Sequence, residues 1–244
     1  MAHAPSIPMQ GGEHEATTTG LNHRKLLMWA FLGSDCMFFA SLIATYLVYK
    51  GKSLSGPFPI DVFDIPVTSV STFVLLMSSM SMVLAYAALN RGNLKVFRIW
   101  ILSTILMGMT FLAFQVFEFR SFVVHEVVVE CSQVGTGQLT ALEEEVGARG
   151  CVDGVHEYEE QVGLTPKTNL FGTTFFVLIG FHGAHVTLGV IWLLSLFFFS
   201  FRRGKVSAAR SLDVDIAALY WHFVDVVWIV IFTVVYLFGV FEGF

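Results

Sequence analysis

The sequence predicts an all-α fold: a polytopic membrane helix bundle of five transmembrane helices, with the N-terminus inside and the C-terminus outside. Of the 244 residues, 55% are hydrophobic and only 14% are charged, whereas soluble domains carry about 25% charged residues. The mean hydropathy is +0.70. Five segments are long and apolar enough to cross a bilayer, which takes roughly 20 apolar residues per helix. The composition indicates an integral membrane protein and no nucleic-acid binding.

The helices are expected at 26–49, 67–89, 96–119, 170–200 and 216–241, since a helix satisfies its own backbone hydrogen bonds in lipid. Residues 1–25 are polar and lack the apolar core of a signal peptide, so the first helix is expected to remain as an anchor after a disordered inner tail. The domain organisation is then this tail, three helices in 26–119, a hydrophilic insert over 120–168 and two helices in 169–244. The helix at 67–89 is rich in Ser and Thr, which favours close helix packing.

The distribution of Lys and Arg predicts the orientation. With the N-terminus inside, nine of the 14 basic residues fall on the inner side and five on the outer side, as the positive-inside rule favours. Trp29, Trp100 and Tyr236 lie near helix ends, which fits anchoring at the membrane interfaces.

The insert at 120–168 is acidic and contains two cysteines. Its acidic residues are Glu126, Glu130, Glu143, Glu144, Glu145, Asp153, Glu157, Glu159 and Glu160. Because disulfides persist on the oxidising side of a membrane, Cys131 and Cys151 are disulfide candidates, with two free thiols as the alternative. The third cysteine, Cys36, is expected to be a small buried residue of the first helix.

Ionisable and polar residues inside the predicted helices are the candidate functional positions, because each charge near the bilayer centre costs roughly 2.5–3.5 kcal/mol on insertion scales. Asp35 and Asp225 both lie about 13 Å from the inner side, with His222 one turn lower. These three are expected to share an inner layer, in which Asp35 is either a proton-handling or lipid-contacting group or a buried carboxyl that is neutral or paired with His222. Glu118, near Gln115, is expected to form an outer layer with His182 or His185.

His182 and His185 share one helix face because they are three residues apart. Paired histidines can bind haem or copper, but a metal site needs three or four ligands, and no further histidine matches their depth except His222. The expectation is therefore packed imidazoles and no metal site. No catalytic residue is expected in this chain.

These same residues carry a family resemblance. The stretches GFHGAHVTLGVIW (180–192) and LYWHFVDVVWIVIFTVVYLFG (219–239) resemble the two signature helices of subunit III of haem-copper terminal oxidases. LGSDCMFFASLIATY (32–46) is similar to the first helix of the five-helix form of that subunit, and FDIPVTSVSTFVLLMSS (63–79) and FQVFEF (114–119) follow in the same order.

The resemblance implies a non-catalytic subunit that packs against the catalytic subunit I and subunit II of a proton-pumping oxidase in a bacterial plasma membrane. It implies that haem and copper lie in the partner subunits, that none is bound here, and that phospholipid can bind. It also assigns Asp35 and Glu118 to the family's intramembrane carboxylates for proton uptake or lipid contact. Gln115, His182, His185, His222 and Asp225 would fall at the family's intramembrane polar positions.

Two departures from the family pattern leave questions open. The two helices that begin the seven-helix form are absent, and those helices make one wall of its lipid cleft. The acidic insert is longer than expected. It either contacts a partner, which would be another subunit or a basic electron donor such as cytochrome c, or it is a decorated loop.

The electron donor is expected to be cytochrome c, with quinol as the alternative. An accessory subunit of a nitric oxide reductase and a stand-alone proton-coupled transporter are further alternatives, although five unlike helices lack the repeats of many transporters.

Overall fold

The computed structural model describes residues 22–52, 63–124, 126–136, 139, 141–151, 157–161, 163–202, 206–207 and 211–240. Five of the helices in these ranges are long and apolar enough to cross a membrane, which confirms the all-α bundle. They are α1 (His23–Tyr49), α3 (Ile65–Asn90), α4 (Leu94–Val123), α6 (Leu170–Phe199) and α7 (Leu212–Ile231). The last of these continues through a π-helical turn, η3 (Phe232–Leu237), into the short α8 (Phe238–Val240). Most of the expected tail, residues 1–21, and residues 53–62 of the connection between α1 and α3 lie outside the described ranges.

Three of the helices begin two or three residues before the predicted positions, because polar caps precede the apolar runs. The side chains of Asn22, Asp64 and Asn93 accept backbone N–H groups in the first turns of α1, α3 and α4. Such caps satisfy amides that have no partner within the helix. At the other end, α4 extends to Val123, four residues past its predicted end and into the range assigned to the insert.

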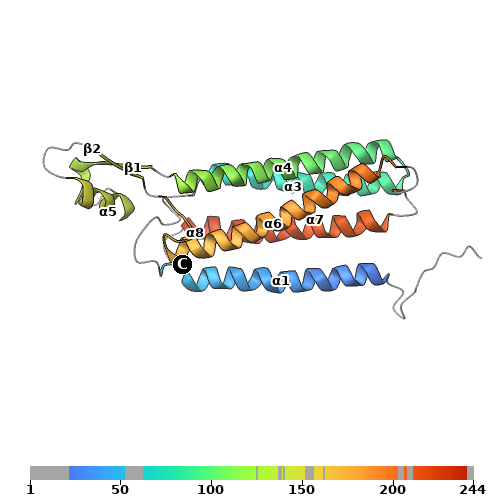
Figure 1. The fold of residues 1–244 in the computed structure, drawn as a ribbon, viewed down its shortest axis with the longest axis horizontal. Helices are drawn as coiled ribbons and strands as arrows, with labels where there is room; N and C mark the ends of the chain where they lie inside the picture. Colours follow the sequence, from blue (N-terminus) through green and yellow to red (C-terminus); the bar gives the residue numbers. More distant parts are fainter. Residues whose placement is uncertain are drawn as a thin grey trace, which may run out of the picture.

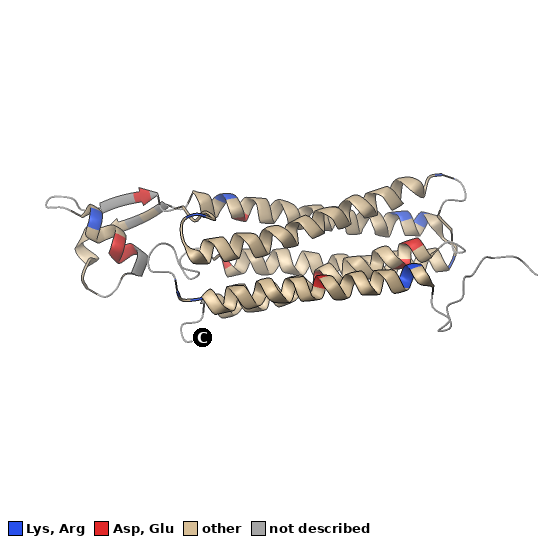
Figure 2. Cartoon of the chain, turned by 60° about the horizontal axis from the view of Figure 1, so that its bottom comes forward, with Lys and Arg blue, Asp and Glu red and all other residues tan. Residues whose placement is uncertain are grey.

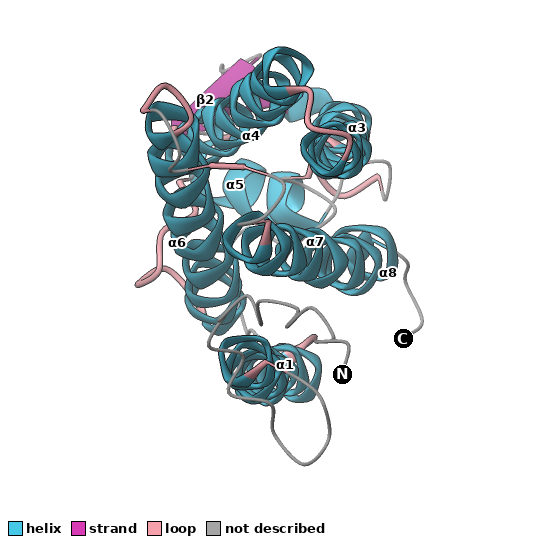
Figure 3. Cartoon of the chain, turned by 90° about the vertical axis from the view of Figure 1, so that its right-hand side faces the viewer, coloured by secondary structure: helices cyan, strands magenta, loops and turns pink. Residues whose placement is uncertain are grey.

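The five long helices lie side by side, with α1 on the outside (Figures 1 and 3). The tightest neighbours are α3 and α4, which a short turn joins; α7 packs against α3 and α6, and α1 packs against α6 and α7. Within the α3–α4 pair, Ser81 donates to the Trp100 carbonyl and Thr104 donates to Ser81, both at 3.0 Å. These buried hydroxyls confirm the packing role predicted for the Ser- and Thr-rich helix.

Trp221 of α7 lies at the centre of the bundle, where two glycines make room for its indole. A Cβ at Gly108 of α4 would lie 2.7 Å from Trp221 Cη2, and one at Gly189 of α6 would lie 3.0 Å from Cε3. The side chain is 1% exposed. The absence of a Cβ at both positions therefore allows α4 and α6 to approach α7 across this ring.

The insert forms a small unit at one end of the bundle, beyond the end of α4 (Figure 1). Strand β1 (Glu126–Glu130) pairs antiparallel with β2 (Glu157–Gln161), and α5 (Ala141–Gly150) packs against them. Val127, Val129 and Val146 form its own buried cluster, separate from the core of the bundle. The end of the bundle that carries this unit is called the insert end below, and the opposite end, where α1 begins, the N-terminal end.

Lys and Arg gather toward the two ends of the bundle and are absent from the described residues of its middle (Figure 2). At the N-terminal end, two ion pairs join the first turns of α1 and α7: Arg24–Asp213 at 2.6 Å and Lys25–Asp215 at 2.7 Å. Asp213 and Asp215 also complement the positive end of the α7 dipole. Since α1 packs on one side only, these pairs help to fix its position.

The Lys25–Asp215 pair is expected to contribute more to the free energy of unfolding than the Arg24–Asp213 pair. A double-mutant cycle with Lys25→Met and Asp215→Asn should give a coupling free energy of about 0.5–1 kcal/mol at low salt, decreasing as salt is added. The side chains of this pair are 35% and 20% exposed, against 65% and 47% for Arg24 and Asp213, so the matched cycle on the second pair should give less. Thermal unfolding of the detergent-solubilised protein measures both, and equal, salt-independent couplings would contradict the expectation.

Candidate functional site: polar groups inside the bundle

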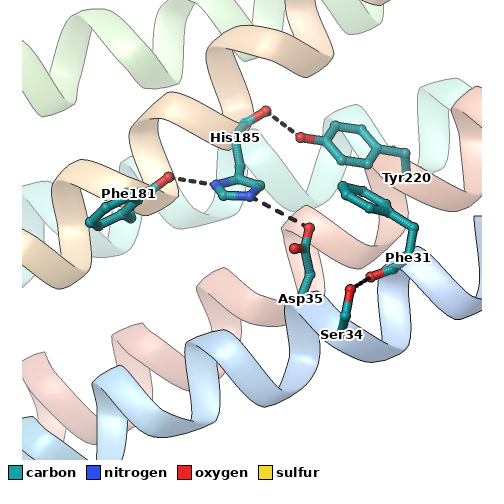
Figure 4. A network of polar contacts seen from close by, with 6 residues as sticks. All are labelled: Phe31, Ser34, Asp35, Phe181, His185 and Tyr220. Carbon is teal, nitrogen blue, oxygen red and sulfur yellow. Dashed lines mark hydrogen bonds and ion pairs between the residues drawn. The ribbon is translucent and has the colours of Figure 1, made fainter.

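Asp35 of α1 lies against His185 of α6, near the middle of the two helices (Figure 4). Asp35 Oδ2 is 3.5 Å from His185 Nε2, and the two side chains are 15% and 17% exposed. The alternative in which Asp35 is paired with His222 is therefore wrong: α1 packs this carboxyl against α6, whereas His222 contacts α3. Asp35 and His185 had been assigned to different layers, so the depth estimated along each helix did not group the candidates correctly.

A contact within α6 orients the His185 ring. His185 Nδ1 is 2.8 Å from the carbonyl oxygen of Phe181, and a carbonyl can only accept, so Nδ1 is the donor in this contact. Nε2 then faces the Asp35 carboxyl, and the two side chains form a polar contact within the membrane-spanning part of the chain.

Aromatic side chains pack around the Asp35–His185 pair. Tyr220 of α7 donates to the backbone carbonyl of His185 at 3.0 Å and stacks on Phe31 of α1 with ring centroids 6.4 Å apart. The ring of Phe39 lies edge-on to the His185 ring, with the ring centroids 5.0 Å apart.

Cys36, one residue beyond Asp35, is exposed on the face of α1 that points away from the bundle. Its predicted burial is wrong because α1 has helix neighbours on one side only.

Glu118 lies near the insert end of α4 and is 9% exposed. It accepts hydrogen bonds from Thr68 of α3 at 2.6 Å and from Tyr236 of η3 at 3.3 Å. The expected layer of Glu118 with His182 or His185 is therefore wrong, because two hydroxyl donors from α3 and η3 surround this carboxyl instead. Tyr236 is fully buried, so its predicted role as an interfacial anchor is also wrong.

Replacing Glu118 with leucine should leave the buried Tyr236 hydroxyl without an acceptor and lower the free energy of unfolding by about 1–3 kcal/mol. Thr68 is less affected, because it also donates to the Asp64 carbonyl at 3.0 Å. The matched control is Glu118→Leu combined with Tyr236→Phe, which removes the orphaned donor and should recover part of the loss. Thermal unfolding in detergent measures this; a double variant no more stable than Glu118→Leu would argue against the hydroxyl as the cause.

Gln115 and His182 connect α4, α6 and α7. Gln115 Nε2 donates to the Ile179 carbonyl of α6 at 3.1 Å, and His182 Nε2 is 3.2 Å from the Val224 carbonyl of α7. His182 is fully buried, and its ring stacks at a tilt on Trp228 with centroids 4.9 Å apart. Because these groups bond to backbone carbonyls of neighbouring helices, they fix helix register. In the described part of the chain, no three His, Cys, Asp or Glu side chains are grouped closely enough to hold a metal ion.

His222 and Asp225 lie on the face of α7 that packs against α3. Along this contact, three side chains of α7 meet hydroxyls of α3: Trp221 Nε1 donates to Ser78 at 3.0 Å, His222 Nδ1 lies 2.5 Å from Ser79 Oγ, and Trp228 Nε1 donates to Thr72 at 2.9 Å. The hydroxyls of α3 and the Trp and His residues of α7 are visible in the sequence, and both sets suggest a polar contact, but the individual pairs depend on the rotation of the helices. Asp225 lies between the second and third pairs and is 3% exposed.

In the insert, Cys131 and Cys151 are joined by a disulfide, with Cα atoms 5.5 Å apart. Cys131 directly follows β1 and Cys151 directly follows α5. The bond therefore fastens the helix to the strand pair. On α5, Arg149 lies 3.8 Å from Glu145 and 3.5 Å from Glu160 of β2, which adds a polar connection between the same elements.

Comparison with known proteins identifies relatives that match nearly the whole chain. The sequence model described as "Cytochrome c oxidase subunit III" matches residues 152–240. The chain is 34% identical to a cytochrome c oxidase subunit 3 of Bacillus sp. (strain PS3), over 93% of this chain and 91% of the relative. It is also 34% identical to a quinol oxidase subunit 3 of Bacillus subtilis (strain 168), over 93% and 92% of the two chains, and 32% identical to a cytochrome bo(3) ubiquinol oxidase subunit 3 of Pseudomonas putida, over 87% and 84%. The five apolar helices, their internal polar contacts and these relatives together show that the chain belongs to the subunit III family of haem-copper terminal oxidases.

Proposed function

We propose that this subunit III serves in a cytochrome c oxidase, where it packs against subunits I and II and supports proton uptake and the stability of the catalytic subunit. Haem and copper would lie in those partner subunits. The acidic insert is the observation that favours cytochrome c as the electron donor. It has nine acidic and three basic residues in 120–168. An acidic surface steers basic proteins such as cytochrome c toward it and raises the association rate.

The orientation proposed for the chain has the N-terminus inside, the C-terminus outside and the insert on the outer surface. The disulfide of the insert supports this, because such bonds persist on the oxidising side. This argument from the disulfide is independent of the distribution of Lys and Arg, which favours the same orientation. For a bacterial plasma membrane, the outer surface is also where a soluble electron donor meets the complex.

For proton uptake, we propose that Asp35 exchanges a proton with the neighbouring His185, whose Nε2 lies 3.5 Å from its carboxyl. The pair lies within the membrane-spanning part of the bundle, where a charge that is not paired is costly. Glu118 is proposed to play a structural part instead, since its two oxygens accept hydrogen bonds from α3 and η3.

Phospholipid is proposed to bind at the insert end, between α1 and the end of the last helix. A cavity of about 450 Å³ there is lined by Leu47, Lys50, Val234 and Phe238. The three apolar residues suit an acyl chain, and the Lys50 ammonium suits a phosphate, although it also donates to the Phe238 carbonyl at 2.6 Å.

Quinol oxidase is the second candidate function, favoured by the relatives named quinol oxidase subunit 3, which match over as much of the chain. Electrons would then come from a lipid-soluble donor, and the insert would contact another subunit or remain a decorated loop. The two candidates share every feature of the helix bundle and differ in what the insert does.

The deciding experiment purifies the complex through a tag on the N-terminus and records its reduced-minus-oxidised spectrum and its turnover with each donor. Haem-a bands and turnover with cytochrome c support the proposal, whereas haem-o or haem-b bands with quinol turnover assign it to the second candidate. The role of the insert is tested with Glu143→Gln, Glu144→Gln and Glu145→Gln together. The KM for cytochrome c should rise at low ionic strength and converge with that of the wild type at high salt. An unchanged KM at low salt would show that the insert does not steer the donor.

A further inference from the structure

The Lys and Arg side chains at the N-terminal end of the bundle fall into two groups with different partners. The Arg and the Lys in the first turn of α1 each form an ion pair with an aspartate of α7. Lys95 and Arg98, at the start of α4, form no ion pair with any residue that the structure describes. Since α4 lies across the bundle from α1 (Figure 3), the described residues leave positive charge uncompensated on the α4 side of this end.

Arg98 is held in one position against the end of α6. Its Nε donates to Ser200 Oγ at 3.1 Å, and its Nη2 donates to the Ser200 carbonyl. Its guanidinium carbon also lies 4.5 Å from the centre of the Phe201 ring, which is a cation–π contact. The acceptors on Ser200 are neutral groups, so these contacts orient the guanidinium without cancelling its charge. Of the five N–H donors of a guanidinium, two are used here, and the other three can bind an acceptor from outside the chain.

Lys95 adds a second positive charge on the same face of α4. Residues three apart along a helix are neighbours on its surface, and the Lys95 side chain is exposed one turn nearer the end of the bundle than Arg98. The N–H groups in the first turn of α4 add a partial positive charge at the same place. Lys95 and Arg98 therefore form a basic patch that suits an anion. A phosphate is the best fit, because it can accept paired hydrogen bonds from one guanidinium.

The apolar surroundings of Arg98 favour a lipid as the source of this phosphate. Phe201, whose ring contacts Arg98, is 57% exposed, and Phe198, about one turn before it, is 64% exposed. Arg98 lies four residues beyond the start of α4, at about 6 Å along the helix, and Ser200 directly follows α6. The guanidinium therefore lies where two apolar spans end, which is the depth of lipid headgroups. A soluble anion would use the guanidinium alone, whereas a phospholipid would also cover the exposed rings.

We propose that Arg98 and Lys95 form a binding site for the phosphate of an anionic phospholipid. The phosphate accepts hydrogen bonds from the remaining N–H groups of Arg98, Lys95 adds attraction to the net negative charge, and an acyl chain packs on Phe198 and Phe201. Because Arg98 is already oriented by α6, little side-chain entropy is lost on binding. The site lies at the opposite end of the bundle from the cavity at Lys50, and it depends neither on the electron donor nor on the orientation proposed above.

The test is photo-crosslinking of the purified oxidase complex in phosphatidylcholine nanodiscs. The discs contain a small fraction of phosphatidylglycerol with a photoreactive group beside its glycerol, and peptide mass spectrometry measures the labelling of residues 94–102 and 196–202. The same probe with a phosphatidylcholine headgroup should label these segments more weakly. Arg98→Gln should lower the labelling by phosphatidylglycerol about fivefold, and Lys95→Gln should lower it to a similar extent. Arg24→Gln is the matched control, since it removes a positive charge at the same end that Asp213 already pairs, and it should leave the labelling unchanged.

Four results would overturn the proposal. Equal labelling by the two probes would show no preference for an anionic lipid, and wild-type labelling in both Arg98→Gln and Lys95→Gln would show that these residues do not bind it. Competition by an excess of inorganic phosphate would assign the patch to a soluble anion, and no labelling in the intact complex would mean that another subunit covers it. Because Arg98→Gln also removes two hydrogen bonds to Ser200, its unfolding temperature is measured alongside. If that variant loosens α6, Lys95→Gln, which leaves the bonds of Arg98 in place, still decides the outcome.

Discussion

Replacing Trp221 with alanine is expected to destabilise the bundle by about 3–5 kcal/mol, the range for removing a large buried aromatic side chain. The indole occupies the space over Gly108 and Gly189, so its loss leaves a cavity where α4, α6 and α7 meet. The hydrogen bond from its Nε1 to Ser78 of α3 is lost as well. Because this one side chain of α7 contacts three other helices, α3, α4 and α6, we expect the whole bundle to loosen and the subunit to dissociate from the purified complex.

The matched control for this variant is Trp29→Ala, since Trp29 is 59% exposed and its loss leaves no cavity. Thermal unfolding in detergent and the amount of subunit III retained in the purified complex give the two readouts. Equal effects of the two substitutions would contradict the central position of Trp221. A further variant, Gly108→Val, approaches the same contact from the other side and should also destabilise, because its side chain cannot fit against the indole.

The sequence predicted the number and approximate position of the helices because length and hydropathy are properties of each segment alone. The contacts between polar residues were predicted less well, since they depend on the rotation of each helix about its axis. Asp35 illustrates this: it was grouped with His222 and Asp225, but its side chain meets His185, which had been assigned to the other layer. Glu118 is a second case, because its hydroxyl partners, Thr68 and Tyr236, come from segments that had been assigned to packing and to the interface.

The insert was predicted as an acidic outer loop, and its internal structure was missed. Its strands are five residues long, and the described residues between them form a 3-10 turn (Cys131–Gln133) and the short helix α5. Valines at 127, 129 and 146 are the apolar signal of its core, but three residues are too few to stand out in a segment dominated by glutamate. The pair of cysteines was the stronger indication, because a small unit with so few buried residues depends on a cross-link.

Removing the disulfide with Cys131→Ser and Cys151→Ser is expected to unfold the insert selectively. The bond closes a loop with a sequence separation of 20 residues, for which the chain-entropy estimate is about 3 kcal/mol. The three buried valines of the insert supply about 4.5–9 kcal/mol in total, at roughly 1.5–3 kcal/mol for each fully buried side chain. The conformational entropy lost by the ordered residues of the insert, at about 1–2 kcal/mol per residue, more than offsets this. Its stability should therefore be lost almost completely, whereas the bundle, whose core is separate, should keep its unfolding temperature.

Limited proteolysis of the complex measures this directly, because cleavage between residues 124 and 163 reports on the insert and thermal unfolding reports on the bundle. Cys36→Ser is the matched control, since it removes a cysteine outside the insert that forms no disulfide, and it should change neither readout. If the double variant resisted proteolysis as well as the wild type, the strand pair and α5 would be stable without the cross-link. If it instead lowered the unfolding temperature of the bundle, the insert would be coupled to the helices through Leu164, whose N–H donates to the Phe122 carbonyl at 2.8 Å where the chain returns to the membrane.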